Sequence, residues 1–259
     1  MIDTHTHLYL PEFEEDGCAS AVERALAAGV GHLVLPNVDE SSVEPMLRLH
    51  SQFPESTSVA MGLHPTEVGD DWREIVSLVE ERLAGGGYVA VGEVGIDLYW
   101  DASRREQQME AFRAQLALAK KYSLPVIIHC REGLPEVLEC IAAEDAADAG
   151  LLFHSFTGTA DDARRILKAA PSAMFGINGV VTFKSAKALR EALPTIGVER
   201  MVFETDSPYL APVPYRGRRN ESAYIGNVCR CVAAELGLDA DALEAATDDN
   251  ARNFFRLGG

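Results

Sequence analysis

The sequence contains few cysteines, and their arrangement does not suit disulfide bonds. There are five, an odd number, at scattered positions along the 259 residues. A small secreted domain that depends on disulfides usually carries an even set of closely spaced cysteines. We therefore expect free thiols and a reducing compartment. Cys130 is expected in the core, because it is adjacent to His129 in an apolar run and successive strand residues point to opposite faces.

Long apolar runs are also missing. No stretch is long enough to cross a bilayer, and the first residues include acidic and histidine side chains where a secretory signal needs a basic region followed by an apolar one. We therefore expect a cytoplasmic protein that makes no membrane contact.

Positive charge is scarce as well. The chain has 23 Lys and Arg against 40 Asp and Glu, a formal net charge of -17. A protein that binds nucleic acid over a broad surface normally does so with clustered Lys and Arg, so this class is disfavoured. Any anionic substrate must be held locally, and bound divalent cations would supply positive charge in a site lined with carboxylates.

What the sequence does contain is an alternation of short apolar runs with longer amphipathic segments such as REQQMEAFRAQLALAKKY. This pattern is typical of βα units and a parallel sheet. Eight runs are expected as strands: Met1–Leu8, His32–Val38, Ser58–His64, Tyr88–Ile96, Pro125–Cys130, Leu151–Phe156, Met174–Val181 and Met201–Asp206. Eight units in about 250 residues fit one (β/α)8 TIM barrel of the metallohydrolase type over residues 1–259. A doubly wound open sheet is the alternative, weakened because no G-x-G-x-x-G turn follows the first run.

Ionisable residues interrupt these apolar runs at or near their carboxyl ends. They are His5, His7, His64, Glu93, His129, His154 and Asp206. In a barrel all of these ends meet at one mouth, where catalytic residues gather. A lone histidine in an apolar run is more often a hydrogen-bonded core residue than a ligand. Several of them together with carboxylates instead favour a metal centre. His32 and His50 lack such a position and are expected to be structural or surface residues.

The order of motifs resembles the TatD-type metal-dependent nucleases, which belong to the amidohydrolase-like group of metallohydrolase barrels. The resemblance covers nearly the whole chain. It is carried by DTHTHL, GLHP, VAVGEVGIDLYW, LPVIIHCRE, LLFHSFTG, FGINGVVTFK, FETDSPYLAP and RGRRNES, in that order.

The resemblance implies two divalent metal ions, Mg²⁺, Mn²⁺ or Zn²⁺, and assigns their ligands. His5, His7 and Asp206 would hold one ion, Glu93 would bridge, and His129 and His154 would hold the second. Glu204 is expected to bind the second ion or orient water, and His64 to contact substrate phosphate. Asp206, Glu93 and Glu204 are the expected catalytic residues, with Asp206 or Glu204 handling the proton.

Local positive charge for a phosphate is expected from Arg131, Arg216 and Arg218, with Asn220 beside them. Guanidinium groups bind phosphate oxygens in pairs, which suits this role. The alternatives are that the arginines are ordinary surface charges and that Asn220 only fixes its loop.

Three functions remain open. The first is hydrolysis of phosphodiester bonds at single-stranded DNA or RNA ends by a metal-activated water, that is, an exodeoxyribonuclease-like enzyme. The alternative is hydrolysis of a small amide, lactone or aminoacyl-tRNA ester on the same site. The third is a catalytically idle metal-binding protein, disfavoured because no expected ligand is missing. We expect a monomer with no obligate protein partner.

Overall fold

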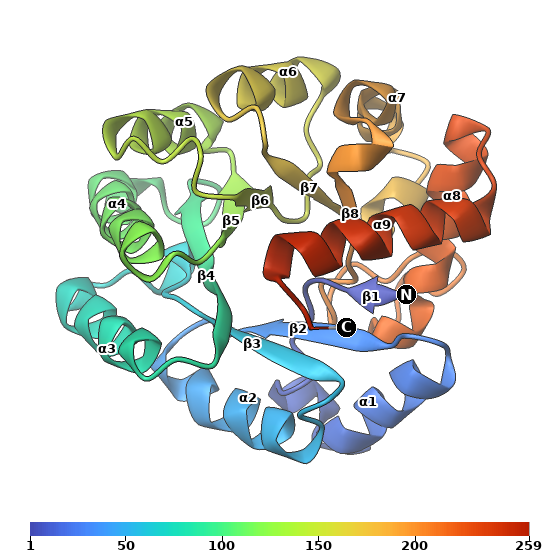
Figure 1. Ribbon diagram of the computed structural model, residues 1–259, viewed down its shortest axis with the longest axis horizontal. Helices are drawn as coiled ribbons and strands as arrows, with labels where there is room; N and C mark the ends of the chain where they lie inside the picture. The colour runs from blue at the N-terminus through green and yellow to red at the C-terminus, as the bar shows by residue number, and fades with distance from the viewer. Residues whose placement is uncertain (259) are drawn as a thin grey trace.

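The computed structural model describes residues 1–258, which form a nearly closed barrel of eight parallel strands in the order β1 to β8 (Figure 1). The expected TIM barrel is confirmed. The strands are β1 Ile2–Asp3, β2 His32–Pro36, β3 Thr57–Met61, β4 Tyr88–Asp97, β5 Val126–Arg131, β6 Leu151–Phe153, β7 Met174–Ile177 and β8 Met201–Phe203. Each strand pairs in parallel with the next.

The first strand is much shorter than the expected Met1–Leu8. The backbone N–H of His5 donates to the side chain of Asp3 at 3.3 Å, a local turn that competes with continued strand pairing. Hydrogen bonds nevertheless close the barrel between its first and last segments. Thr4 N donates to the Phe203 carbonyl at 3.1 Å, and Thr6 forms a parallel bridge with Ser207.

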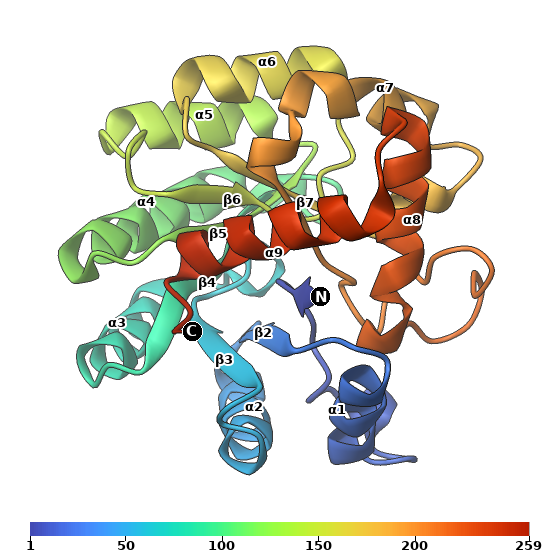
Figure 2. The same cartoon turned by 45° about the vertical axis from the view of Figure 1, so that its right-hand side comes forward.

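Helices surround the strands (Figures 1 and 2). Within residues 1–258 they are α1 Cys18–Ala27, α2 Glu40–Gln52, α3 Trp72–Ala84, α4 Arg105–Tyr122, α5 Leu134–Ala143, α6 Ala160–Ala169, α7 Lys187–Ile196, α8 Ile225–Leu236 and α9 Ala240–Phe255. Short 3₁₀ turns lie at η1 Pro11–Phe13, η2 Pro65–Glu67, η3 Ala102–Arg104, η4 Gly179–Thr182, η5 Val198–Arg200 and η6 Ser222–Tyr224. The amphipathic segment singled out in the sequence is α4, with the same bounds. In this part of the chain no helix is both long and apolar enough to span a membrane.

Two layers of apolar residues alternate along the strands. One set packs outward against the helices, as Leu33 and Leu35 do in β2. The other set forms a separate inner cluster of Ile2, Val34, Ala60, Ala90, Ile127, Leu152, Met174 and Val202, closed by Ala251 and Phe255 of α9. We call this cluster the inner ring. It fills the amino-terminal end of the barrel, in agreement with strand alternation.

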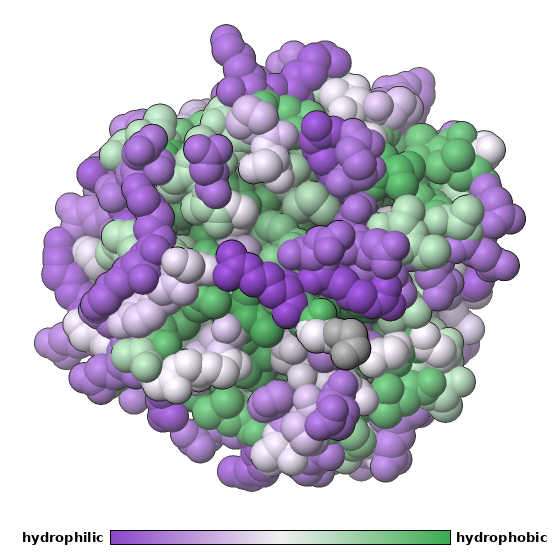
Figure 3. All heavy atoms as spheres, viewed as in Figure 1, coloured by the Kyte–Doolittle hydropathy of each residue, from purple (hydrophilic) through white to green (hydrophobic). Residues whose placement is uncertain are grey.

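Helix α9 lies across this end of the barrel, where both chain ends are also found (Figures 1 and 2). The Met1 ammonium group donates to Glu244 at 3.0 Å, and Ile2 N donates to Asp248 at 2.8 Å. Hydrophilic side chains cover the middle of this face, over α9 (Figure 3). The amino-terminal end is thus sealed, and the interior is accessible from the carboxyl ends of the strands.

Candidate metal centre

The inward-facing strand positions change character two residues beyond the inner ring. Ile127 is followed at this spacing by His129, Leu152 by His154 and Val202 by Glu204. Since side chains two residues apart lie on the same side of a strand, these polar groups enter the barrel interior above the apolar ring.

A glycine provides space for one of these side chains. A Cβ atom at Gly176 of β7 would lie 2.1 Å from Oε2 of Glu204. Any larger residue at Gly176 would displace the carboxylate. The absence of a side chain at this position therefore leaves room for a buried polar group above the inner ring.

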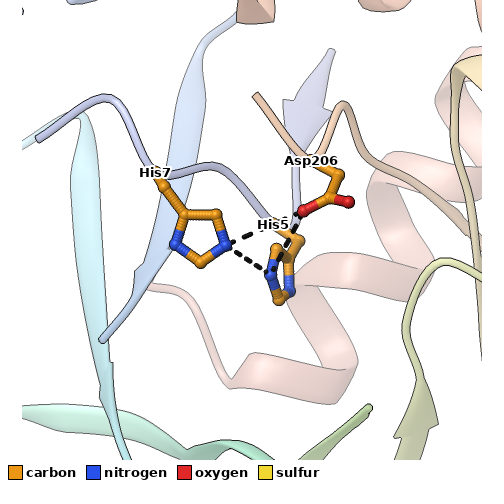
Figure 4. A group of neighbouring side chains, drawn as sticks. All are labelled: His5, His7 and Asp206. Atoms are coloured by element: carbon orange, nitrogen blue, oxygen red, sulfur yellow. Dashed lines mark hydrogen bonds and ion pairs between the residues drawn. The ribbon is translucent and has the colours of Figure 1, made fainter. Parts of the chain in front are cut away.

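The first group of possible ligands comprises His5, His7 and Asp206 (Figure 4). Nε2 of His7 lies 3.1 Å from Nε2 of His5 and 3.7 Å from Oδ1 of Asp206. The segments after β1 and β8 are held together by two backbone hydrogen bonds, from Asp206 N to the His5 carbonyl at 2.9 Å and from His7 N to Ser207 O at 2.8 Å. Barrel closure thus positions all three side chains.

Glu93 lies between two sets of imidazoles and turns one oxygen toward each. Its Oε2 is 3.1 Å from Nε2 of His5, and its Oε1 is 2.6 Å from Nε2 of His154 and 2.8 Å from Nδ1 of His129. A carboxylate in this arrangement is suited to bridge two cations. Glu93 lies in the middle of β4, not at its end as expected. The pairing register of β4 with β5 shifts between Val91 and Val94, and such irregularities redirect side chains.

The second group contains His129 and His154, the expected ligands, and also His64. Nε2 of His64 lies 3.2 Å from Nδ1 of His129 and 3.3 Å from Oε1 of Glu93. His64 precedes η2, where its Nδ1 lies 2.6 Å from the Thr66 hydroxyl. The sequence assigned His64 to phosphate contact, and the structure places it beside the same Glu93 oxygen as His129 and His154, although 0.5 Å or more farther from it.

Hydrogen bonds outside the cluster determine which nitrogen of each ring faces inward. The Tyr9 hydroxyl donates to the Pro36 carbonyl, so it accepts from Nδ1 of His7 at 2.9 Å and leaves the His7 Nε2 lone pair pointing inward. Likewise Nε2 of His129 donates to Oδ2 of Asp97 at 2.8 Å. Nδ1 of neutral His129 is then an acceptor facing the Glu93 carboxylate, which is also an acceptor.

A divalent cation fits this arrangement of donors. Two acceptors at 2.8 Å need a proton or a cation between them, and imidazole nitrogens with carboxylate oxygens are ligands that Zn²⁺ and Mn²⁺ accept. In addition, Nδ1 of His5 and Nδ1 of His154 are buried without a hydrogen-bond partner among residues 1–258. Histidines oriented from outside by Asp97 and Tyr9 follow the usual pattern around protein-bound metals.

The protonation of the cluster agrees with a ligand role. Burial lowers the pKa of His5 to about 4 and that of His7 to about 3, with neighbouring histidines adding to the effect. Both rings are therefore neutral at pH 7, the form that binds metal. Burial, together with the nearby carboxylates of Glu93 and Glu204, raises the pKa of Asp206 to about 8 against the opposing effect of His154.

Three other imidazole and carboxylate groups show competing effects. Burial lowers the pKa of His129 and of His154, but carboxylates outweigh it in both, chiefly Asp97 at His129 and Glu93 at His154, so both pKa values are raised. Burial raises the pKa of Glu93, but the adjacent His154, His64 and His5 outweigh it and the pKa falls well below its ordinary value. Without a metal, Glu93 is thus an anion beside imidazoles that hold a proton more readily than usual, and a bound cation would take the place of that proton.

Glu204 is completely buried beside this cluster. Its Oε1 accepts from the backbone N–H of Ser155 and lies 3.5 Å from Nδ1 of His154. Its Oε2 has no partner among the described residues. The position supports an orienting role toward His154 and leaves one oxygen available to a further group.

The structure does not bring together the other four residues that were expected, like His64, to bind phosphate. Arg131 lines the cavity above the cluster. Arg216 instead packs over the ring of Phe183 at 4.5 Å, and Arg218 lines a separate surface depression with Glu12. Asn220 is fully buried, and its amide donates to the carbonyls of Thr205 and Tyr209. The expectation for Asn220 needs correction: its donors are taken up in fixing the loop after β8.

Two orienting residues, Asp97 and Tyr9, were not foreseen. Asp97 ends the apolar run VAVGEVGID, so the reasoning from strand ends would have included it had that run been extended by one residue. The role of Tyr9 depends on contacts with Pro36 that no local pattern reveals. His32 and His50 lie elsewhere as expected, bonded to Ser58 and Thr57 respectively. Cys130 is partly buried and packs against the hydrophobic core, as expected, and it also contributes to the cavity wall.

The cavity has a volume of about 670 Å³ and opens at the carboxyl ends of the strands. His7, His64, Glu93, His129, His154 and Asp206 form its floor, and Trp100, Arg131, Tyr209 and Leu210 lie among its walls. This size is within the range of pockets that hold a small molecule.

Comparison with known proteins agrees with this geometry. Residues 2–256 match the family of TatD related DNases. The chain belongs to this family. It is therefore a metal-dependent hydrolase of the TatD type, as the sequence motifs implied.

Relatives of this TatD-family chain cover its whole length. It is 35% identical to the Bacillus subtilis protein YabD, described as an uncharacterized metal-dependent hydrolase, over 99% of both chains. It is also 35% identical to the 3'-5' ssDNA/RNA exonuclease TatD of Dickeya dadantii, over 100% of this chain and 98% of the relative. Among solved structures, the TatD homologue YJJV of Escherichia coli superposes with a TM-score of 0.89 at 28% identity, over 100% and 98% of the two chains.

Proposed function

We propose that this chain is a metal-dependent nuclease that removes nucleotides from the ends of single-stranded DNA or RNA. The observation that supports it most is the convergence of five imidazoles on the two oxygens of Glu93, with Asp206 beside two of them, beneath an open cavity. Relatives at 32 to 35% identity are named 3'-5' ssDNA/RNA exonucleases. We further propose that the protein acts as a monomer without an obligate protein partner.

The donor groups suit two divalent ions, Mg²⁺, Mn²⁺ or Zn²⁺. His5, His7 and Asp206 would hold one, and His129 and His154 the other, with Glu93 shared and His64 close enough to join the second group. When bound, such ions lower the pKa of water and neutralise the charge of a phosphodiester.

The residues of the chain contribute orientation and proton handling. Asp97 and Tyr9 fix the rings of His129 and His7. Asp206 directs Oδ1 toward Nε2 of His5 and of His7, as a ligand would, so its other oxygen, Oδ2, is suited to take a proton. Glu204 holds the His154 side of the cluster. Arg131 supplies a guanidinium to the cavity wall, where it can contact a phosphate oxygen.

The shape of the cavity supports a strand end as substrate. Its walls enclose about 670 Å³, which suits small ligands and leaves the reacting groups at its floor. A phosphodiester within a closed duplex would have to reach this floor past the surrounding loops, whereas a free single-stranded end can enter directly.

The test is a single-turnover assay of metal-stripped protein, resupplied with Mg²⁺, Mn²⁺ or Zn²⁺, on end-labelled single-stranded DNA and RNA. We expect stepwise shortening that requires added metal and is lost in Asp206→Asn. Asp249→Asn, an exposed change on α9, is the matched control and should cleave normally. Absence of cleavage with every metal, in protein shown to bind two ions, would contradict the nuclease proposal. Equal cutting of closed circular DNA would contradict the preference for ends.

A further inference from the structure

Exposed apolar side chains gather around the cavity mouth. Within residues 1–258 the exposed large apolar residues are Leu78, Tyr99, Trp100, Tyr209, Leu210, Val213 and Leu238. All the aromatic ones follow β4 or β8, and Trp100, Tyr209 and Leu210 line the cavity. An exposed apolar patch next to a functional cavity marks a binding surface more often than a lone exposed side chain does.

The largest exposed fraction belongs to Trp100, at 69%. Its ring meets that of Tyr99 edge to face, with centroids 5.1 Å apart and planes at 84°. The Arg131 guanidinium lies 3.8 Å from the Tyr99 ring centre and 5.6 Å from that of Trp100. We call these three residues the aromatic corner. In it Arg131 packs against Tyr99, so the indole is left free to contact a ligand.

One buried carboxylate ties the aromatic corner to the metal centre. Oδ1 of Asp97 accepts from the backbone N–H groups of both Tyr99 and Trp100, each at 3.0 Å. Oδ2 of the same residue accepts from Nε2 of His129 at 2.8 Å. Asp97, which is only 1% exposed, therefore anchors the backbone that carries the indole at a set position relative to the reacting groups. A preformed contact surface loses less freedom when a ligand binds.

The charge of the cavity limits how an anionic strand can be held. Its wall and floor include Glu67, Glu93, Asp97 and Asp206, and Arg131 is the one Lys or Arg among the described residues that line it. The chain as a whole carries a net charge of -17. Contacts with the backbone phosphates therefore have to be few. Stacking of a nucleobase on an aromatic ring contributes affinity without positive charge, and it works for every base.

We propose that Trp100 is a positioning residue on which a base of the bound strand end stacks, while Arg131 beside it contacts the adjacent phosphate. The proposal rests on the proposed nuclease function and adds how the strand end is held. It assigns recognition to the flat face of the base, so cleavage does not depend on base identity. It also assigns the distance between the base and the reacting phosphodiester to the link through Asp97.

The first experiment uses tryptophan fluorescence, because the chain has only two tryptophans and the other, Trp72 of α3, is 6% exposed. In the full-length Trp72→Phe protein the emission reports Trp100 alone. A short oligothymidylate with phosphorothioate linkages, added in the presence of Mg²⁺, should quench this emission. The same oligonucleotide with abasic terminal sites should bind more weakly, by about tenfold, and should quench little.

The second experiment uses variants and a KM-against-kcat comparison. Trp100→Ala should raise KM for single-stranded DNA by about tenfold with a smaller change in kcat, and Trp100→Phe should restore most of the loss because a flat ring remains. Removing the terminal bases should raise KM in the wild type but produce no further rise in Trp100→Ala. Leu238→Ala, which truncates another exposed apolar residue, is the matched control and should behave as the wild type.

The outcomes separate this proposal from the function on which it rests. A KM for single-stranded DNA that is unchanged in Trp100→Ala, or a wild-type KM that is the same for base-bearing and abasic strands, would overturn the stacking role and leave the nuclease proposal standing. If the protein binds its metal ions but neither binds nor cleaves any oligonucleotide, both the stacking role and the nuclease proposal are overturned. An equal KM increase in Trp100→Ala and Trp100→Phe, unaffected by removal of the bases, would show a structural effect and likewise overturn the stacking role.

Discussion

The two ends of the barrel interior are built from the same strands and differ completely in chemistry. At the amino-terminal end the inward positions carry Val, Ala, Ile, Leu and Met, and Phe255 of α9 closes the ring. Two residues further along, the inward positions are polar. They carry His129 within β5, His154 just after β6 and Glu204 just after β8. The apolar end gains free energy from burial, whereas the polar end holds ionisable groups away from water at a cost. The comparison shows that the residues that stabilise the barrel and those suited to bind metal lie only two positions apart along the same strands.

The largest expected effect comes from removing the carboxylate that both groups of imidazoles share. Glu93→Gln should lower kcat/KM by at least about a thousandfold, because the amide cannot bridge two cations with two anionic oxygens. The amino-terminal end should be unaffected, so the chain should fold. Activity and metal content by mass spectrometry check this result, with Glu191→Gln, an exposed change on α7, as the control. A variant that retains two ions and full activity would contradict the bridging role.

The opposite perturbation breaks the apolar end. Phe255→Ala removes a side chain that is 2% exposed and packs on the inner ring. The cavity left behind should lower the free energy of unfolding by about 3 to 5 kcal/mol. Metal affinity of the folded protein should change little, because the centre lies at the other end. Denaturant titration and calorimetric metal binding test the separation, and Leu238→Ala should lie within about 0.5 kcal/mol of the wild type.

A smaller effect on metal binding is expected from changing a residue that only orients one of the possible ligands. Asp97→Asn keeps the size of the side chain but weakens the orientation of His129. Loss of such an orienting group typically lowers metal affinity by about 10- to 100-fold. Calorimetric titration with Mn²⁺ measures this effect. An unchanged affinity would show that His129 is positioned by its strand alone.

The smallest effect concerns an ion pair on the surface, between Asp16 and Arg219. The hydrogen bond and charge of Arg219 lower the pKa of Asp16 from 3.8 to about 2. A lowered carboxyl pKa stabilises the folded state above the unfolded-state pKa, and this contribution is lost as pH falls from about 4 to 2. The stability difference between wild type and Asp16→Asn should therefore shrink across this window. In an Arg219→Met background this pH dependence should be smaller, with the remainder due to Arg24, which lies 2.9 Å from Asp16. An unchanged pH dependence there would show that Arg219 does not cause it.

Much of the fold and the floor of the site could be predicted from the sequence, because strand alternation and strand ends are local features. The position of α4 and the gathering of His5, His129, His154 and Asp206 follow from such patterns. The place of Glu93 does not, because a register shift in β4 redirects it. The packing of α9 over the amino-terminal end of the barrel could not be predicted from local patterns either, because the inner ring that it covers forms only when all the strands are assembled.

The side chains of the loop after β8 show where local reasoning fails. Arg216, Arg218 and Asn220 lie close together in sequence, yet one stacks on Phe183, one faces a different depression and one is buried under its own loop. A run of basic residues does not define the direction in which each points, because loop geometry depends on backbone contacts such as those that Asn220 makes with Thr205 and Tyr209.

Asp97 has a consequence for how such an enzyme can be altered. Its two oxygens serve two neighbours, the loop that carries Trp100 and the ring of His129. A substitution there changes both at once, so this position cannot be used to retune one property independently. Residues 99 and 100 project from the loop beyond that shared anchor and can vary without disturbing it. For a designer or an evolving lineage, new preferences are therefore accessible at the loop tip, while its root stays constrained.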